Sequence, residues 1–204
     1  METARYLDSL LLHYSGSFNI YQPYVIKNKE YPAYGLFYSI VEKYVLVREA
    51  NMWSTICYDH VLFMETDTCT EETFSEAKAI IEEYMEPVLV RKGEKYPEKN
   101  HMYSYLNVVI VSKNPIAESL SKKIKKYKFD KGYLFNFRGY SKGSIICVTL
   151  EDKQFVSNYH SRDKKKMYLQ VFDDIEKDKP TFSRVMEERG LQPFKQEETG
   201  NNLT

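Results

Sequence analysis

The run Tyr105–Val111, Tyr-Leu-Asn-Val-Val-Ile-Val, constrains the fold of this chain more than any other segment, since it is the most apolar and most β-branched run in the sequence. Such a run suits a strand that is covered on both faces better than one with a solvent-facing side. Helical patterns lie on both sides of it, from about residue 68 to 85 and from about 114 to 127. The sequence therefore predicts a central strand packed between layers of helices.

The segment before this run predicts a helix followed by a meander of strands. Apolar residues at helical spacing predict an amphipathic helix over residues 3–15, with Gly16 as its stop. Connectors such as residues 42–43 are short, which implies antiparallel pairing of the strands that follow. Aromatic and β-branched runs place these strands near residues 17–26, 33–41, 44–50 and 55–64.

Two helices with recognisable ends flank the central strand. Thr68–Glu71 fits a capping box for the first helix, and Pro87 is expected to end it. Residues 91–100 carry Lys, Glu, Pro and Gly without periodicity, which is typical of an exposed, mobile loop. For the second helix, Asn114 supplies an N-cap and Pro115 the first helical position.

The rest of the chain predicts further strands and a last helix. A strand over Gly132–Arg138 would complete a right-handed crossover and run parallel to the central strand. Residues 144–150 and 154–159 then predict an antiparallel pair joined by a turn at 151–153. After His160 the sequence is charged and helix-compatible, and Gly190 is expected to stop a short helix, with a Schellman cap at Leu191.

These elements predict a single α+β domain over residues 1–190, with a mixed, mostly antiparallel sheet and helices packed on its faces, and a frayed tail over 191–204. The 43% hydrophobic content excludes wholesale disorder. Lys and Arg balance Asp and Glu at 29 each, so the net charge gives no sign of a polyanionic partner.

The start of the chain lacks the pattern of a signal peptide, and a cytoplasmic protein is expected. Three widely spaced cysteines, read as reduced packing residues, agree with that compartment: Cys57, Cys69 and Cys147.

The order of elements is similar to the core of the restriction-endonuclease-like, PD-(D/E)xK, nucleases. That family holds a divalent metal with an acid at one strand and Glu-x-Lys at the next, because phosphodiester cleavage needs hard oxygen ligands and a nearby cation. The resemblance implies Asp130, Glu151 and Lys153 as the catalytic residues. The alternative is that Glu151–Lys153 is a solvated hairpin turn, since the same triplet pattern recurs at 76–78 and 163–165.

Two segments could bind an anion. Ser112, Lys113 and Asn114 follow the central strand and precede a helix N-terminus, which attracts negative charge. A basic group further along could follow a phosphate backbone, with Tyr127, Tyr133 or Tyr140 available for stacking. The alternative for this group is a set of solvated cations at a helix C-terminus. Its members are Lys122, Lys123, Lys125, Lys126, Lys128 and Lys131, with Arg138 and Lys142 nearby.

The histidines and the known sequence motifs carry less information about function. His60 with Asp59 and Glu65, and His160 with Asp163, could be ligands or acid-base groups, although half-buried structural histidines are commoner. On a strand Asp59 would point away from His60, so these two would not share a site. The chain has no glycine-rich nucleotide loop, no zinc-binding pattern and no nucleophile elbow. No cofactor or resident metal is therefore assigned.

The leading hypothesis is a non-catalytic binding or accessory protein whose partner is a protein or a small anionic ligand. Nucleic acid is a less supported partner, and binding to a membrane is not expected. The alternative is a divalent-metal-dependent nuclease-like enzyme.

Overall fold

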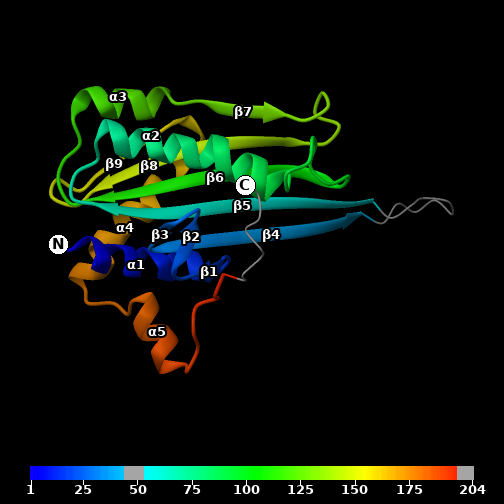
Figure 1. Cartoon of the computed structure of the whole chain (residues 1–204). Helices are drawn as coiled ribbons and strands as arrows, with labels where there is room; N and C mark the ends of the chain where they lie inside the picture. Colours follow the sequence, from blue (N-terminus) through cyan, green and yellow to red (C-terminus); the bar gives the residue numbers. More distant parts are fainter. Residues whose placement is uncertain (44–52, 197–204) are drawn as a thin grey trace.

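A mixed seven-stranded sheet organises the computed structural model, which describes residues 1–43 and 53–196 (Figure 1). Its strand order is β1-β4-β5-β6-β8-β7, with β9 beside β8. A separate hairpin joins β2 (Tyr24–Ile26) to β3 (Lys29–Tyr31). The strands of the main sheet are β1 (Asn19–Tyr21), β4 (Ala33–Lys43), β5 (Trp53–Thr66), β6 (His101–Ser112), β7 (Phe129–Gly132), β8 (Tyr140–Thr149) and β9 (Gln154–Ser157).

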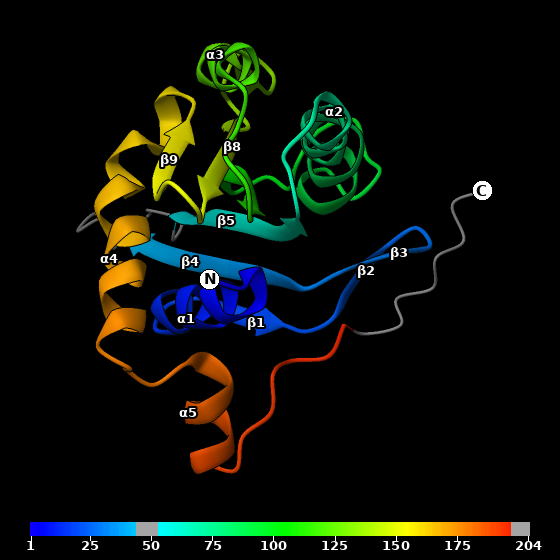
Figure 2. The same cartoon turned by 90° about the vertical axis from the view of Figure 1, so that its left-hand side faces the viewer.

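Helices cover both faces of this sheet, as the end-on view in Figure 2 shows. One face carries α2 (Glu71–Ala79), which continues as the π-helix η1 (Ile80–Val90), and α3 (Glu118–Lys126). The other face carries α1 (Thr3–Ser15) and α4 (Lys165–Glu176). The 3₁₀ helix η2 (Tyr159–Lys164) precedes α4, and α5 (Phe182–Glu188) packs beside α1. This architecture confirms the predicted α+β class. Within the described part of the chain, every helix is too short or too polar to span a lipid bilayer.

The predicted central strand lies in β6, which pairs in parallel with β5 on one side and with β8 on the other. Its alternate side chains enter two separate cores. Leu106 and Ile110 face the α2 and α3 side, whereas Val109 and Val111 face the α1 and α4 side, and all four are fully buried. Burial on both faces explains why this run is apolar almost throughout, with Asn107 as the exception.

The strand predicted over Gly132–Arg138 is wrong. Residues 133–138 form a loop, and the short strand β7 before it is antiparallel to β8. The parallel partner of β6 is therefore β8, one element later than predicted. Leu134, Phe135 and Asn136 all adopt positive φ, which an extended strand does not allow.

Two predicted helix ends also differ from the structure. Pro87 does not end the first helix, because the helix widens into η1 from Ile80 onward and continues through Pro87. At the end of η1, Arg91 N–H donates to the Glu86 carbonyl five residues earlier. This wider spacing tolerates the missing proline N–H. The N-cap of α2 is Thr70, not Thr68, and its box partner is Thr73.

The second flanking helix, α3, begins later than predicted. Its N-cap is Ala117. The Asn114 side chain instead donates to Thr68 Oγ1 at 2.9 Å, which ties the connection after β6 to the one after β5.

The other predicted boundaries have mixed outcomes, and some lie outside the described residues. The turn predicted at 42–43 is wrong, since β4 runs through Lys43, and the strand predicted near 44–50 lies outside the described residues. At Gly190 the helix ends in the predicted Schellman cap, with Leu191 N–H donating to the Met186 carbonyl. In the tail, Phe194 bridges Tyr21, and residues 197–204 lie outside the described part.

We predict that Ile110→Ala lowers the free energy of unfolding by about 3 kcal/mol, because it leaves a cavity beneath a strand covered on both faces. Ile40→Ala, at a side chain that is 54% exposed, should cost under about 1 kcal/mol. Urea unfolding of both variants measures the two values. Equal losses would contradict the assignment of β6 as the centre of the core.

Candidate functional site

The structure does not bring the nuclease-like residues together. Asp130 lies on β7 opposite Lys142, with its carboxylate 3.2 Å from His160 Nε2. Glu151 is exposed in the hairpin after β8, nine positions beyond Lys142 along the chain. Lys153 lies in the same hairpin and pairs with Glu176 at 2.5 Å. At about 3.3 Å per strand residue, the stretch of β8 between the partner of Asp130 and the hairpin spans roughly 20 Å, so Asp130 and Glu151 lie far apart. Among the described residues, no group of three His, Cys, Asp or Glu side chains is placed to hold a metal.

The residues of the predicted anion site after β6 form hydrogen bonds within the connections between the sheet and its helices. Ser112 is buried, accepts a hydrogen bond from Cys69 N–H at 3.1 Å and donates to the Asn114 carbonyl at 2.9 Å. Lys113 is exposed, and its backbone bonds to Thr66 and Glu151. These contacts join the ends of three adjacent strands.

The basic group divides between two places. Lys122 pairs with Glu118 at 2.7 Å and Lys126 is exposed, so both lie on the solvent side of α3. Arg138 lies near the start of β6, at the opposite end of the strand from Ser112, and donates to the Pro97 carbonyl at 3.2 Å. The anion candidates therefore do not form one site.

The two histidines considered from the sequence and the three cysteines make structural contacts. His60 is buried beside Tyr34, with Nδ1 2.6 Å from the tyrosine hydroxyl, and burial lowers its pKa to about 3. His160 pairs with Asp130, not with Asp163. The cysteines are all free and buried: Cys57, Cys69 and Cys147.

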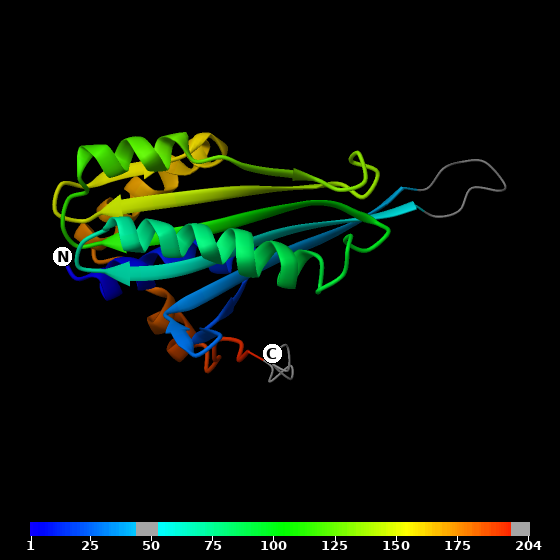
Figure 3. The same cartoon turned by 45° about the horizontal axis from the view of Figure 1, so that its top comes forward.

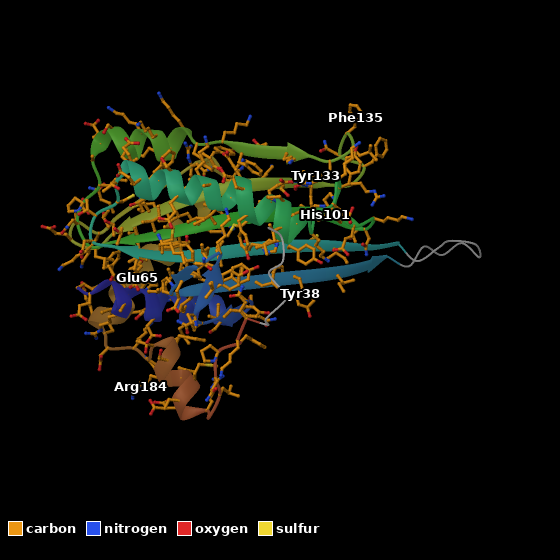
Figure 4. All side chains as sticks on the ribbon, viewed as in Figure 1. Tyr38, Glu65, His101, Tyr133, Phe135 and Arg184 are labelled. Atoms are coloured by element: carbon orange, nitrogen blue, oxygen red, sulfur yellow. The ribbon has the colours of Figure 1, made fainter. Side chains whose placement is uncertain are left out.

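A different region, the loop between β7 and β8, has the properties of a contact site. We call residues 133–139 the aromatic loop. It lies at the end of the sheet opposite the N-terminus, which we call the distal end (Figure 3). Phe135 is 93% exposed and Phe137 is 82% exposed, and Figure 4 shows Phe135 at the outer end of the loop that follows β7. Other exposed large hydrophobic side chains at this end are Tyr38, Ile40, Met102 and Leu134.

The backbone of the aromatic loop is held in an uncommon conformation. Leu134, Phe135 and Asn136 have φ values of 48°, 54° and 67°, where non-glycine residues are rare. Backbone hydrogen bonds close the loop, with Phe137 N–H donating to the Leu134 carbonyl at 3.0 Å. Gly139 has φ of 74°, and a Cβ there would overlap the Met102 carbonyl. Such strain persists where surrounding contacts fix it, and it concentrates at functional positions.

A cluster of the buried Glu86 with Arg91, Lys131 and Tyr133, which we call the charge cluster, supports the aromatic loop. Glu86, in η1, has a side chain only 3% exposed. Arg91 Nε donates to it at 2.7 Å and Lys131 Nζ at 2.9 Å, and the Tyr133 hydroxyl donates at 3.0 Å. Burial alone would raise the pKa of Glu86, but Arg91, Lys131 and Tyr133 together outweigh burial and hold this pKa below its ordinary value. The carboxylate therefore joins η1, β7 and the first residue of the loop.

His101 fixes the other end of the aromatic loop. Its Nδ1 is 2.8 Å from the Arg138 carbonyl, which can only accept, so Nδ1 carries the proton. Its Nε2 then accepts from the Ser104 hydroxyl at 2.8 Å. Burial lowers the pKa of His101, which keeps the ring neutral. The ring also packs edge-on against Tyr133, so both loop ends are anchored.

Sequence reasoning missed the aromatic loop because alternating Tyr, Phe and Phe residues resemble a strand. The contrary signal was present. Gly132 and Gly139 bound the segment, and Asn136, which tolerates positive φ, stands inside it.

We predict that Glu86→Gln lowers the free energy of unfolding at pH 7 by about 2–3 kcal/mol, because two cations lose a buried carboxylate. Since the folded pKa of Glu86 is lowered, its stabilisation is complete above the unfolded pKa of about 4.3 and is lost as pH falls through the folded value. Urea unfolding from pH 7 to pH 3 should show the difference from the unmodified protein shrinking. The exposed Glu151→Gln control should change stability by under about 0.5 kcal/mol throughout. A difference that does not vary with pH would contradict the cluster's role.

Comparison with protein families matched residues 2–170 to a family described as a domain of unknown function, DUF8052. Comparisons with curated proteins and with solved structures found no match. The matched segment runs from α1 into α4 and contains the charge cluster and the aromatic loop. The chain therefore belongs to the DUF8052 family.

Proposed function

We propose that this protein is a cytoplasmic, non-catalytic binding domain that engages a protein partner through the aromatic loop. The observation that carries the proposal is the exposure of Phe135 and Phe137 on a backbone fixed at both ends. Large aromatic side chains give much contact area at low entropic cost when they are held rigidly, and they are enriched at the centres of protein interfaces.

The surroundings of the aromatic loop fit this use. Met102 and Leu134 extend the apolar surface beside the two phenylalanines. Arg138, half-buried at the base of the loop, adds a residue type that is common in such interfaces. The charge cluster below keeps the backbone in place without partner contact, so less conformational entropy would be lost on binding.

The nuclease-like alternative finds less support in the geometry. Its three residues lie on two separated parts of the sheet, and the Lys153 amine is paired with Glu176. Cleavage of DNA or RNA with Mg²⁺ or Mn²⁺ that disappears in Glu151→Ala would overturn the binding proposal.

We predict that a photoreactive phenylalanine analogue in place of Phe135 forms one defined adduct with a protein partner in cells, because this side chain lies at the centre of the contact. Adding Phe137→Ser should abolish the adduct while leaving the thermal unfolding temperature unchanged, since both rings are solvent-exposed. The adduct is detected by mass shift and identified by peptide sequencing.

The matched control places the same analogue at Leu191, which is 55% exposed at the end of α5, away from the distal end (Figure 1). This position should give no adduct with the same partner. Equal capture at positions 135 and 191, or capture that survives Phe137→Ser, would contradict a specific contact at the loop.

A further inference from the structure

A second surface at the distal end lies on the α1 and α4 face of the sheet. Helices α1 and α4 lie over the half of the sheet near the N-terminus, and the strands extend beyond them (Figure 1). The pairing register puts one row of side chains directly past η2, made of Phe37, Asp59, Tyr105 and Lys142. The next row contains Tyr103 and Tyr140, paired on adjacent strands. We call the partly exposed members of the two rows the tyrosine face: Phe37, Asp59, Tyr103, Tyr105, Tyr140 and Lys142.

The three tyrosines form a continuous aromatic array. The ring centres of Tyr103 and Tyr105 are 4.9 Å apart, and those of Tyr103 and Tyr140 are 6.0 Å apart with an interplanar angle of 25°. Burial is the largest cause of a rise in the pKa of Tyr105 to about 12, so its hydroxyl is neutral near pH 7. All three rings are partly exposed, so each can offer apolar surface and a hydrogen-bonding hydroxyl.

The edge of the tyrosine face along η2 is polar and ordered. Asp59 accepts from the Asn107 amide at 2.6 Å and lies 3.7 Å from Lys164 Nζ. The Ser161 hydroxyl bonds to Asn107 at 3.4 Å. Burial raises the pKa of Asp59 despite the opposing effects of Lys164 and Asn107. This network fixes η2 against β5 and β6 and so sets the boundary of the array.

The charge around the tyrosine face favours an anionic ligand. Two nearby acids already have a lysine partner, Asp59 with Lys164 at 3.7 Å and Asp130 with Lys128 at 3.6 Å. Lys142 lies 5.2 Å above the Tyr140 ring. Arg162 lies 5.3 Å above the Tyr159 ring at the edge formed by η2. In the hollow beside it, the cations Arg162, Lys165 and Lys166 outnumber the acids Asp163 and Asp173.

We propose that the tyrosine face binds single-stranded nucleic acid. Unpaired bases would stack on the tyrosine rings, and phosphates would lie along Lys142 and the cations of η2 and α4. A duplex keeps its bases stacked inside and offers the rings no flat face, so it should bind less well. A neutral sugar could stack on the rings but would gain nothing from the surrounding cations. This surface is separate from the aromatic loop, so the inference extends beyond the proposed function.

Fluorescence anisotropy with labelled dT and rU 20-mers tests the proposal on the full chain, with a 20-base-pair duplex as comparison. Saturable binding is expected for the single strands and weaker binding for the duplex. Tyr103→Leu and Tyr140→Leu should each weaken binding about tenfold, because they remove a stacking ring. Tyr103→Phe keeps the ring and should stay within about threefold of the unmodified affinity.

Salt dependence separates phosphate contacts from stacking. If three cations contact phosphates, the slope of log affinity against log salt should be about −2, and Lys142→Gln should reduce its size by about 0.7. Phe135→Ser with Phe137→Ser should leave binding unchanged, which distinguishes this surface from the proposed protein contact. Lack of saturable binding at about 50 mM salt, equal affinity for the duplex, or full affinity in both folded Tyr→Leu variants would overturn the proposal.

Discussion

The parallel pairing of β6 with both of its neighbours is the constraint on which the rest of the structure depends. Two consecutive parallel connections, each right-handed and running in the same direction across the sheet, place their helices on the same face. The α2 and η1 helix and α3 occupy that face. The opposite face of β6 is equally apolar, so segments from the two ends of the chain, α1 and α4, have to cover it.

In this arrangement the central strands are longer than the helices that cover them. The 14 residues of β5 extend about 46 Å at strand spacing, whereas the 13 residues of α1 extend only about 20 Å at helical spacing. Helices of this length cannot cover the strands to their ends. The distal part of the sheet therefore carries aromatic side chains with partial exposure, and the tyrosine face and the aromatic loop both lie there.

The charge cluster stabilises the distal end, which the helices do not cover. Glu86 sits in the π-helix, and its partners come from the turn after that helix, from β7 and from the aromatic loop. A buried carboxylate with cations and a hydroxyl around it is costly to break, because each partner would lose a charged hydrogen bond. This contact, with the His101 bond to the Arg138 carbonyl, stabilises a loop whose own backbone is unfavourable.

The sequence by itself determined the elements whose signal is local. The apolar run at Tyr105–Val111, the opening helix and the cap at Gly190 each follow from periodicity or from the conformational freedom of glycine, and the structure has them in place. Tertiary structure alone decided the parallel partner of β6, the passage of the helix through Pro87, and the union of Glu86 with Lys131. The strand pairing and the Glu86–Lys131 contact join residues far apart in the chain, which local sequence patterns do not encode. The passage through Pro87 depends on a wider hydrogen-bond spacing within the helix, which the helical pattern of the sequence did not reveal. The candidate contact surfaces belong to this second group, because exposure is a property of what the rest of the fold fails to cover.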